Sequence, residues 1–332
     1  MIFGYNIPMN VRGFSPKEII FSLTTKCNLR CAHCDTEQTP GVCNGVLNKR
    51  DAFKFLAACA LSGIDRVGFT GGEPFLALEL MCAISKEAAR RGMFFGRIMT
   101  NGAWFRTEKE LLPALKRLFA AGYDGSFCLS VDAFHRQMLK KCASFIRSTT
   151  TIWARPNIVS IAAVKGAKDN ETARRIAEFA RLLHGRLVGP RKRPSAIKGT
   201  GIFIKIFYID LSPVGKAAGL KDPWDGRWFK DDLCEGPGNL FFVLPDGTVK
   251  PCCGYAADAD ILTIGSIKKD SPKELLNNAQ KNRFISSIFS SGFHPIRKRL
   301  ERAGVRFPGK TTNHCFFCRY ITRYMPQPNN FF

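Results

Sequence analysis

The sequence predicts an α/β protein with a parallel sheet and a smaller C-terminal part of different character. Three observations lead to this prediction. Short apolar segments alternate with helical patterns from residue 18 to residue 210. Cysteines gather in two sets, one directly after the first apolar segment and one near the C-terminal end. From residue 211 the alternation stops, because Gly, Pro and Asp interrupt the chain as far as residue 239.

Six segments of the alternating region have the composition of buried β-strands. Each is short, apolar and rich in β-branched or aromatic residues, as expected for strands that are covered on both faces. The predicted strands are Ile19–Thr25, Arg66–Thr70, Phe94–Thr100, Ser126–Val131, Ile158–Val164 and Phe203–Ile209. Helical patterns separate them at residues 49–62, 77–91, 108–121, 135–147 and 169–184. Such alternation predicts parallel βα units, whose chemistry lies at the C-terminal ends of the strands.

The segments after the fifth helical pattern are predicted from turn residues and charge. Residues 185–201 combine Gly and Pro with five basic residues and no acidic one, which predicts a loop. Farther on, Leu240–Leu244 and Val249–Cys252 predict a hairpin, turned by Pro245-Asp246-Gly247. Helical stretches follow at residues 271–303 and lead into a tail that contains cysteines.

Composition limits the class of protein. The chain has 332 residues, of which 45% are hydrophobic, so it can form a sizeable core. No uncharged apolar run approaches the roughly 18 residues that a membrane span needs, and the N-terminus lacks the basic start of a secretory signal. An odd number of cysteines, 13, in a long chain argues against a disulfide framework and for reduced thiols in the cytoplasm. We therefore expect a cytoplasmic protein with no membrane contact.

The first cysteine set predicts a metal cluster. Cys27, Cys31 and Cys34 form the pattern C-x3-C-x2-C directly after the first predicted strand. Three thiolates on one short loop can hold three irons of a [4Fe–4S] cube and leave the fourth iron open. They cannot close a four-ligand structural zinc site by themselves. The alternatives are a zinc knuckle and three cysteines buried in the core.

With this triplet in place, the sequence resembles the radical S-adenosylmethionine (SAM) superfamily over residues 18–210. The residue before the third cysteine is normally aromatic in that family, and His33 takes this position. After the second strand, Thr70 is followed by the residues that match the family's GGEP motif, namely Gly71, Gly72, Glu73 and Pro74. The resemblance implies a partial (β/α)6 TIM-like barrel, followed by a small C-terminal α+β iron–sulfur domain.

The resemblance also implies which residues contact SAM. Adjacent glycines allow close backbone approach to a ligand, and Glu73 would accept hydrogen bonds from the ammonium group of SAM. Thr100 and Asn101 would line the methionine end, although a loop turn fits them equally well. Ser130 and Asp132 resemble the contacts to the ribose hydroxyls. Residues Ser212–Ala217 resemble a segment that borders SAM in the family. His135 lies near the same positions and is a candidate for contacting the substrate, with a structural role as the alternative.

The second cysteine set resembles the opening of SPASM and twitch domains. Cys234 is followed after 12 residues by Gly247 and after four more by Cys252, while Cys315 and Cys318 form C-x2-C near the C-terminal end. Four thiolates would fully ligate an auxiliary [4Fe–4S] cluster. The full SPASM pattern has seven cysteines for two clusters, so the resemblance implies a twitch-like domain with one. A four-cysteine zinc site is the alternative.

The other cysteines are interpreted from their surroundings. Cys253 could replace Cys252 as a ligand. Buried structural thiols are the prediction for the remaining ones, with the loop residue Cys43 set apart from them: Cys43, Cys59, Cys82, Cys128 and Cys142. We expect the domain boundary after residue 217, with residues 1–217 forming the barrel domain and residues 218–332 forming the auxiliary-cluster domain.

The chain is strongly basic. It has 50 basic and 27 acidic residues, a net charge of +23, which favours anionic partners. Together with residues 186–198, the segment 290–325 could form a basic surface, because it holds only Glu301 against Arg297, Lys298, Arg299, Arg302, Arg306, Lys310, Arg319 and Arg323. A generally basic composition is the alternative, and no nucleic-acid-binding motif accompanies the charge.

These resemblances imply an iron–sulfur oxidoreductase with SAM and two [4Fe–4S] clusters as cofactors. It would cleave SAM reductively to a 5′-deoxyadenosyl radical, which removes a hydrogen from the substrate. We expect the substrate to be a ribosomally made peptide that is oxidised or cross-linked. The alternatives are dehydrogenation of a small molecule, modification of RNA, and a basic binding protein stapled by zinc. No catalytic side chain is assigned.

The same resemblances imply partners. An electron donor such as flavodoxin or ferredoxin would reduce the first cluster. Only 26 residues precede Cys27, so we expect a separate leader-binding protein to present a precursor peptide.

Overall fold

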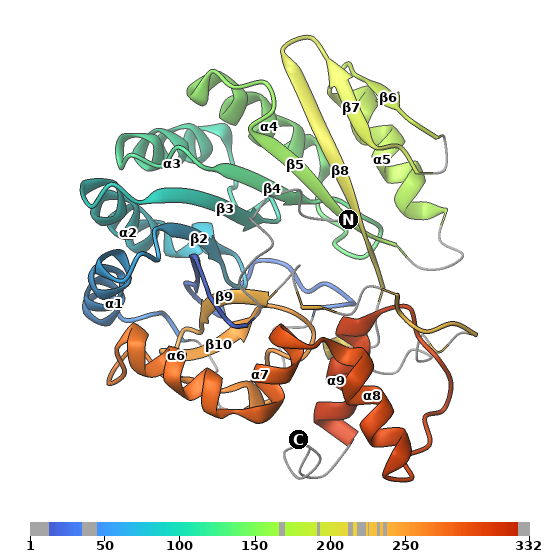
Figure 1. The fold of residues 1–332 in the computed structure, drawn as a ribbon. Helices are drawn as coiled ribbons and strands as arrows, with labels where there is room; N and C mark the ends of the chain where they lie inside the picture. Colours follow the sequence, from blue (N-terminus) through green and yellow to red (C-terminus); the bar gives the residue numbers. More distant parts are fainter. Residues whose placement is uncertain are drawn as a thin grey trace.

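Parallel strands lie side by side in nearly the order in which the chain forms them (Figure 1). The computed structural model describes residues 13–34, 45–165, 170–190, 193–211, 215–217, 224, 226–230, 233–234 and 238–324. Within these residues the sheet has the order β11-β10-β9-β1-β2-β3-β4-β5-β8-β7-β6. The six predicted strands are β1 (Glu18–Ser22), β2 (Arg66–Thr70), β3 (Phe94–Thr100), β4 (Ser126–Ser130), β5 (Val159–Lys165) and β8 (Ile202–Asp210). Each is parallel to the next.

Helices cover one face of these strands, as Figure 1 shows for the row of α1 to α4. The helices of the barrel are α1 (Lys49–Leu61), α2 (Leu78–Arg90), α3 (Glu108–Ala120), α4 (Leu139–Trp153) and α5 (Glu171–Leu182). The helix predicted from residue 135 begins only at Leu139. The reason is a turn in which the Asp132 carboxylate accepts the N–H groups of Phe134 and His135.

The strands curl into an open barrel. Alternate strand residues such as Ile19 and Val67 are fully buried beneath the helices, so the other residues face a concave side. Across this side, the guanidinium carbon of Arg97 in β3 lies 5.7 Å from the ring centroid of Phe207 in β8. Three strand spacings separate β3 from β8 in the sheet, about 14 Å if it were flat. The contact therefore requires curvature, and the predicted partial barrel is confirmed.

The sheet continues beyond β1 into the C-terminal part of the chain. Strand β9 (Gly238–Val243) is parallel to β1, and β10 (Thr248–Cys252) returns antiparallel to β9, as the predicted hairpin requires. Strand β11 (Gly265–Ser266) ends this edge. Backbone pairing thus crosses the boundary that we expect after residue 217, which stays a prediction.

The prediction of a loop at residues 185–201 is wrong. Strands β6 (Arg186–Val188) and β7 (Ala196–Gly199) extend the sheet beyond β8 with antiparallel pairing. Charge and glycine content conceal a short alternation, in which Ile197 is fully buried while Lys198 is exposed. Packing of the buried side chain outweighs the weak strand propensity of the segment.

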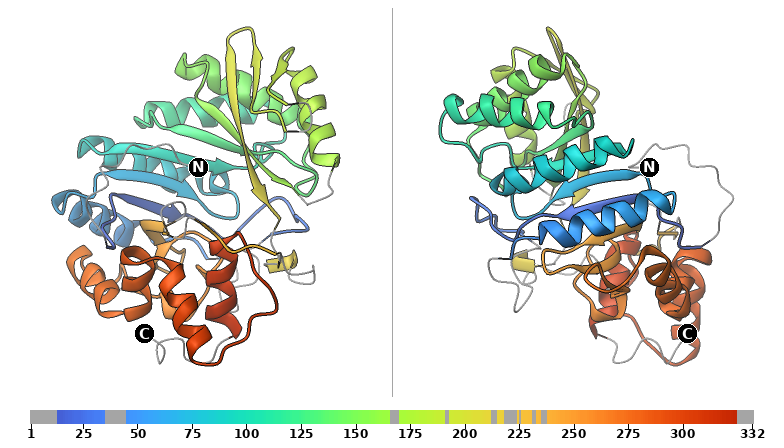
Figure 2. Two further views of the ribbon diagram at one scale, coloured as in Figure 1. Left: turned by 45° about the vertical axis from the view of Figure 1, so that its right-hand side comes forward. Right: turned by 90° about the vertical axis from the view of Figure 1, so that its left-hand side faces the viewer.

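Four helices complete the C-terminal part beside the hairpin, in both views of Figure 2 on the side away from α3 to α5. They are α6 (Pro272–Lys281), α7 (Arg283–Ser290), α8 (Phe293–Arg302) and α9 (His314–Tyr324). Aromatic rings fill the space around α9, where Phe317 packs against Trp228 and Phe307 with centroids 5.8 and 5.2 Å away. No helix within the described ranges has the length and apolar character needed to cross a membrane.

Candidate functional site

The first cysteine set lies on the loop that leaves β1 at its C-terminal end. Backbone hydrogen bonds hold this loop to the end of β2, because the pairing of the two strands continues past their last residues. The N–H of Gly72 donates to the carbonyl of Thr24 at 2.7 Å, and the N–H of Glu73 donates to that of Lys26 at 2.8 Å. Cys27, the first residue of the cysteine set, therefore lies directly beside the Gly-Gly-Glu motif.

Both glycines of the motif are required by this close approach. A Cβ atom at Gly71 would lie 2.7 Å from the carbonyl oxygen of Thr24, and one at Gly72 would lie 2.5 Å from that of Lys26. Gly71 also has φ of +156°, which side chains rarely adopt. The glycines thus admit the backbone of the cysteine loop, a reason that the sequence alone did not reveal. Pro74 follows as a buried residue that begins a short 3₁₀ turn.

Glu73 is completely buried and bridges β2 to the end of β3. Its carboxylate accepts hydrogen bonds from the Thr100 hydroxyl and the Asn101 N–H, both at 2.8 Å, and from the Phe75 N–H at 3.3 Å. Burial raises the pKa of Glu73 to about 7, against the lowering effect of these donors. The structure therefore brings together Glu73, Thr100 and Asn101, three residues that the sequence predicts at one end of SAM.

Asn101 also contacts the cysteine loop. Its side-chain amide donates to Asn28 Oδ1 at 2.9 Å and lies 3.9 Å from Cys27 Sγ. Asn28 in turn donates to the Ala103 carbonyl at 3.2 Å. Asn28 was missed by sequence reasoning, because a lone asparagine inside a cysteine motif carries no recognisable pattern. This network fixes the loop to the end of β3.

On the opposite side of the loop, His33 packs against the turn after β4. Its ring lies edge-on to that of His135, with centroids 4.6 Å apart, and 5.2 Å from that of Phe134. Burial and the neighbouring His135 lower the pKa of His33 to about 4. His135, for which the sequence suggests either a structural or a substrate role, is thus a partner of the cysteine loop.

Asp132 holds this turn together. It is completely buried, and its oxygens accept His135 Nδ1 at 2.8 Å and the Val164 N–H at 3.1 Å in addition to the N–H groups of its own turn. Burial favours the neutral carboxyl, but these donors outweigh it and hold the pKa of Asp132 below its ordinary value. The ligand atoms of His33, Asp132 and His135 lie within 4.8 Å of one another. Hydrogen bonds join Asp132 to His135, whereas His33 meets His135 by ring contact and its buried Nδ1 has no hydrogen-bond partner among the described residues. A ribose contact by Asp132 stays a prediction.

Two more predicted contacts lie nearby. Ser130 ends β4 half-buried, and its carbonyl accepts a hydrogen bond from the side chain of Gln137. Of the segment 212–217, residues 212–214 lie outside the described residues. The remaining part adjoins the loop, since the N–H of Lys216 donates to the carbonyl of Cys34 at 2.9 Å.

The thiols of the first set influence one another. Burial and the neighbouring Cys27 and Cys34 raise the pKa of Cys31 to about 12, while the charge of Lys216 lowers it. Thiolates that repel one another in this way are stabilised by a shared cation, and iron supplies that charge in an iron–sulfur cluster.

The predicted second set also comes together, from three separate parts of the chain. Cys252 ends β10, Cys315 and Cys318 lie on α9, and Cys234 lies just before β9. All are buried except the half-buried Cys315. Burial and then the neighbouring Cys252 and Cys315 raise the pKa of Cys234 well above its usual range. Cys253 is exposed, so Cys252 is the better placed of the two as a ligand.

Two features shape the surroundings of this second set. The Tyr255 N–H donates to Cys315 Sγ at 3.3 Å, the kind of contact that stabilises a thiolate. Arg319 fixes the loop that carries Tyr255, because it donates to the Tyr255 carbonyl at 2.5 Å and to Asp258 at 2.7 Å.

The spacing of the thiols can be compared with that of a single zinc ion. A single zinc ion holds its thiolates about 3.8 Å apart, because tetrahedral ligands lie at about 2.3 Å from it. In the described part of the chain, no three cysteine sulfurs lie within 4.8 Å of one another. Among the described residues, neither set therefore places three thiols at the spacing of a single zinc ion.

The remaining cysteines differ in burial. Cys59, Cys128 and Cys142 are buried, as the sequence predicts, while Cys82 is only half-buried. Cys43 lies outside the described residues.

The basic surface predicted at residues 290–325 is only partly present. Arg297 and Arg319 are 5% and 8% exposed, so these two do not belong to a surface. Arg297 lies 4.7 Å from the Trp228 ring centroid and pairs with Glu301 at 2.6 Å. The other six basic residues of the segment are exposed: Lys298, Arg299, Arg302, Arg306, Lys310 and Arg323.

Comparison with known families agrees with the motifs. Residues 21–153 match the radical SAM superfamily, and residues 234–299 match SPASM, an iron–sulfur cluster-binding domain. The first match contains the first cysteine set and the Gly-Gly-Glu motif. The second contains Cys234 and Cys252, while Cys315 and Cys318 lie beyond it.

Among curated proteins, several similar sequences are called GTP 3′,8-cyclase. The one from Clostridium acetobutylicum is 27% identical over 208 residues, which cover 59% of this chain and 57% of that protein. The one from Desulforamulus reducens is 25% identical over 235 residues, which cover 68% of this chain and 61% of that protein. The chain thus spans about half to three-fifths of the length of these relatives.

Solved structures share the fold over most of the chain. The structure described as native anSMEcpe with bound AdoMet has a TM-score of 0.57 at 15% identity, and the match covers 94% of this chain and 99% of that one. Streptococcus suis SuiB bound to precursor peptide SuiA has a TM-score of 0.59 at 11% identity, covering 91% and 76%. At these identities the likeness shows the fold alone.

The glycine contacts generate a first prediction. Gly72→Ala should destabilise the protein by about 1–3 kcal/mol, because its Cβ would force the backbone of Lys26 away. It should also lower the iron content after anaerobic reconstitution, since the first cysteine set shifts with that backbone. Gly226→Ala is the matched control, because no atom lies within 4 Å of its Cβ position. Equal iron content in both variants would contradict this account.

Asp132 generates a prediction about pH. Because its folded pKa lies below the ordinary value of 3.8, it stabilises the fold above that value, and this stability is lost as pH falls through the folded pKa. Asp132→Asn should therefore cost about 1.5–3 kcal/mol at neutral pH, and less in acid. Urea unfolding of the ligand-free protein measures this, with the exposed Asp124→Asn as control. A cost that stays constant into acid would exclude the proposed charge effect.

Proposed function

Since this chain belongs to the radical SAM superfamily and carries a C-terminal SPASM iron–sulfur domain, we propose that it oxidises or cross-links a ribosomally made peptide. The observation that carries the proposal is the presence of two separate cysteine sets, three thiols on the loop after β1 and four around β10 and α9. Three thiols would leave one iron of a [4Fe–4S] cluster open, and four would ligate a cluster completely.

The two domains imply SAM and iron–sulfur clusters as cofactors. When bound, they supply a 5′-deoxyadenosyl radical that abstracts a hydrogen from the substrate. Cys27, Cys31 and Cys34 would hold the SAM-binding cluster, and Cys234, Cys252, Cys315 and Cys318 would hold the auxiliary one. The chain itself binds and orients these groups: the second set would hold the auxiliary cluster, which would supply an acceptor for the electron that the substrate loses.

The SAM contacts are assigned to two groups of residues. Glu73, Thr100 and Asn101 would orient the methionine end, because the buried carboxylate and its donors lie beside Cys27. His33, Ser130 and Asp132 would face the nucleoside end, with Asp132 acting through the position of His135 and thereby of His33. In this assignment the loop after β4 is a positioning element, fixed before SAM arrives.

Peptide substrates are favoured by what similar folds hold. SuiB has been described with its precursor peptide SuiA, and anSMEcpe with a peptide, on folds that match 91% and 94% of this chain. The proposal includes a precursor peptide as partner, a separate leader-binding protein, and a cytoplasmic location in which the thiols stay reduced.

A second candidate substrate is GTP, because curated relatives such as the Clostridium acetobutylicum protein are called GTP 3′,8-cyclase. The peptide-bound structures whose fold matches most of this chain favour the peptide instead. Incubation of reconstituted protein with SAM, dithionite and either GTP or peptides encoded beside the gene separates the two. A peptide that loses two hydrogens supports the proposal, and a cyclised nucleotide overturns it.

The cysteine sets predict the metal content and its dependence on each set. Anaerobically reconstituted protein should hold about eight iron atoms and cleave SAM to 5′-deoxyadenosine after dithionite treatment. Joint replacement of Cys27, Cys31 and Cys34 by Ala should leave about four irons and abolish cleavage. Stoichiometric zinc with almost no iron would refute the account.

Replacement of two cysteines of the second set provides the complementary variant. Cys315→Ala with Cys318→Ala should also leave about four irons, while cleavage of SAM persists and the peptide product disappears. Loss of solubility together with SAM cleavage would instead assign these cysteines to the stability of the fold. Full product formation by this variant would rule out any role of the auxiliary cluster.

A further inference from the structure

Exposed basic residues from three segments surround the first cysteine set. Two lie on the cysteine loop itself, three lie on the first two turns of α1, and one follows the segment that borders the loop. Asp51 is the acidic residue in the first turn of α1, while Asp35 and Glu37 follow Cys34 in the sequence and lie outside the described residues. We call this set the cluster-side patch: Lys26, Arg30, Lys49, Arg50, Lys54 and Lys216, all exposed.

Hydrogen bonds attach each segment of the patch to the cysteine loop. The N–H of Thr25 donates to the carbonyl of Gly45 at 3.1 Å, and that of Leu47 donates to the carbonyl of Leu23 at 2.9 Å, so the chain enters α1 directly beside the loop. Lys216 is attached through its own N–H to Cys34. These charged residues therefore lie on segments that adjoin the first cysteine set.

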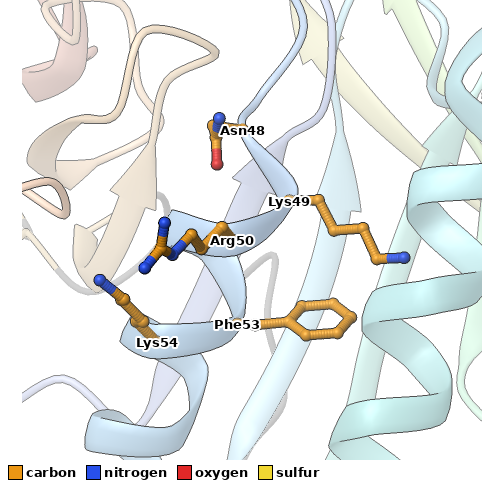
Figure 3. A pocket seen from close by; sticks show the side chains of 5 residues that line it. All are labelled: Asn48, Lys49, Arg50, Phe53 and Lys54. Atoms are coloured by element: carbon orange, nitrogen blue, oxygen red, sulfur yellow. The ribbon is translucent and has the colours of Figure 1, made fainter.

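The α1 part of the patch borders a hollow of about 550 Å³. Figure 3 shows Arg50 and Lys54 next to each other on one flank of the helix, and Lys49 with Phe53 on the other. The Lys49 ammonium lies 5.5 Å from the centroid of the Phe53 ring. The hollow thus offers spread cations around one half-buried aromatic ring.

The position of these cations opposes the stability of the helix. Positive side chains at a helix N-terminus face the positive end of the helix dipole, whereas α1 has no basic residue in its last turn, where they would stabilise it. Residues that violate a local rule without a local gain are expected at functional sites. A partner of opposite charge would supply the gain.

We propose that the cluster-side patch is the docking surface for a small acidic protein that carries single electrons. The inference rests on the proposed function, because that function consumes one electron from outside in each cleavage of SAM. The carrier gives up one electron to the cluster held by Cys27, Cys31 and Cys34 and is itself oxidised by one. Complementary charge steers such encounters and makes them depend on salt.

Direct binding tests the proposal. Flavodoxin is the probe, titrated by calorimetry into reconstituted protein at low and at high salt. Lys49→Glu, Arg50→Glu and Lys54→Glu are combined in one variant. A variant with the same change of charge elsewhere, Lys140→Glu with Arg174→Glu and Arg181→Glu on α4 and α5, is the matched control, since these side chains are also exposed.

We expect the Kd of flavodoxin to rise about tenfold or more in the α1 variant at low salt and to change by less than about twofold in the control. High salt should weaken binding to the wild type and reduce the difference between the variants. Equal weakening in both variants would show that net charge alone determines binding. Unchanged binding in the α1 variant would show that the carrier docks elsewhere. Either result overturns the proposal.

Two further experiments separate the proposal from misfolding of the variant and from binding of nucleic acid. If the glutamate variant loses iron or helix content, Lys49→Gln with Arg50→Gln and Lys54→Gln replaces it, with the same expectation in smaller degree. If the patch binds a short RNA tightly and flavodoxin does not displace that RNA, the patch is a nucleic-acid site and the proposal is overturned. Dithionite-driven SAM cleavage by the wild type tests the proposed function separately, because dithionite needs no docking surface.

Discussion

The pairing of β1 with β2 does not stop where the strands stop, and the rest of the site depends on this. Two backbone hydrogen bonds, from Gly72 to Thr24 and from Glu73 to Lys26, continue the parallel ladder into irregular chain. They fix the beginning of the cysteine loop at the C-terminal end of the barrel, the end at which βα loops meet. Only glycine fits at residues 71 and 72, because any Cβ would strike the opposing backbone. The cysteines thus inherit their position from the sheet rather than from a metal.

Burial then determines the chemistry of the groups that the ladder places together. Glu73 has no exposed surface, and among the described residues the donors that support its charge belong to Thr100, Asn101 and Phe75. Burial and the neighbouring thiols raise the pKa of Cys31, so an incoming iron has to displace a proton from it. The auxiliary set follows the same principle by another route. Its ligands come from a hairpin and a distant helix, and Arg319 joins that helix to the loop that carries Tyr255.

Most of the barrel could be predicted, because buried parallel strands have an apolar composition that periodicity reveals. The cysteine triplet and the Gly-Gly-Glu motif were predictable for another reason, because the residues of each motif are close together in the sequence. Contacts between side chains that are distant in sequence were not. The role of Asn28 depends on Asn101, and that of His135 on His33, and neither pair has a pattern. Charge was misleading in two places: the basic segment 185–201 forms β6 and β7, and Arg297 and Arg319 are buried by an aromatic ring and by a carboxylate.

Hydrogen exchange of single amides in the ligand-free protein tests the central claim most directly. If the extended ladder positions the cysteine loop, the N–H groups of Gly72, Glu73 and Leu47 should exchange as slowly as that of Phe69 within β2, although the first two lie beyond the strand. This protection should be present before iron or SAM is added. Exchange of these amides at the rate of exposed loop residues, with protection only after reconstitution, would show that the metal forms the site and would contradict the account.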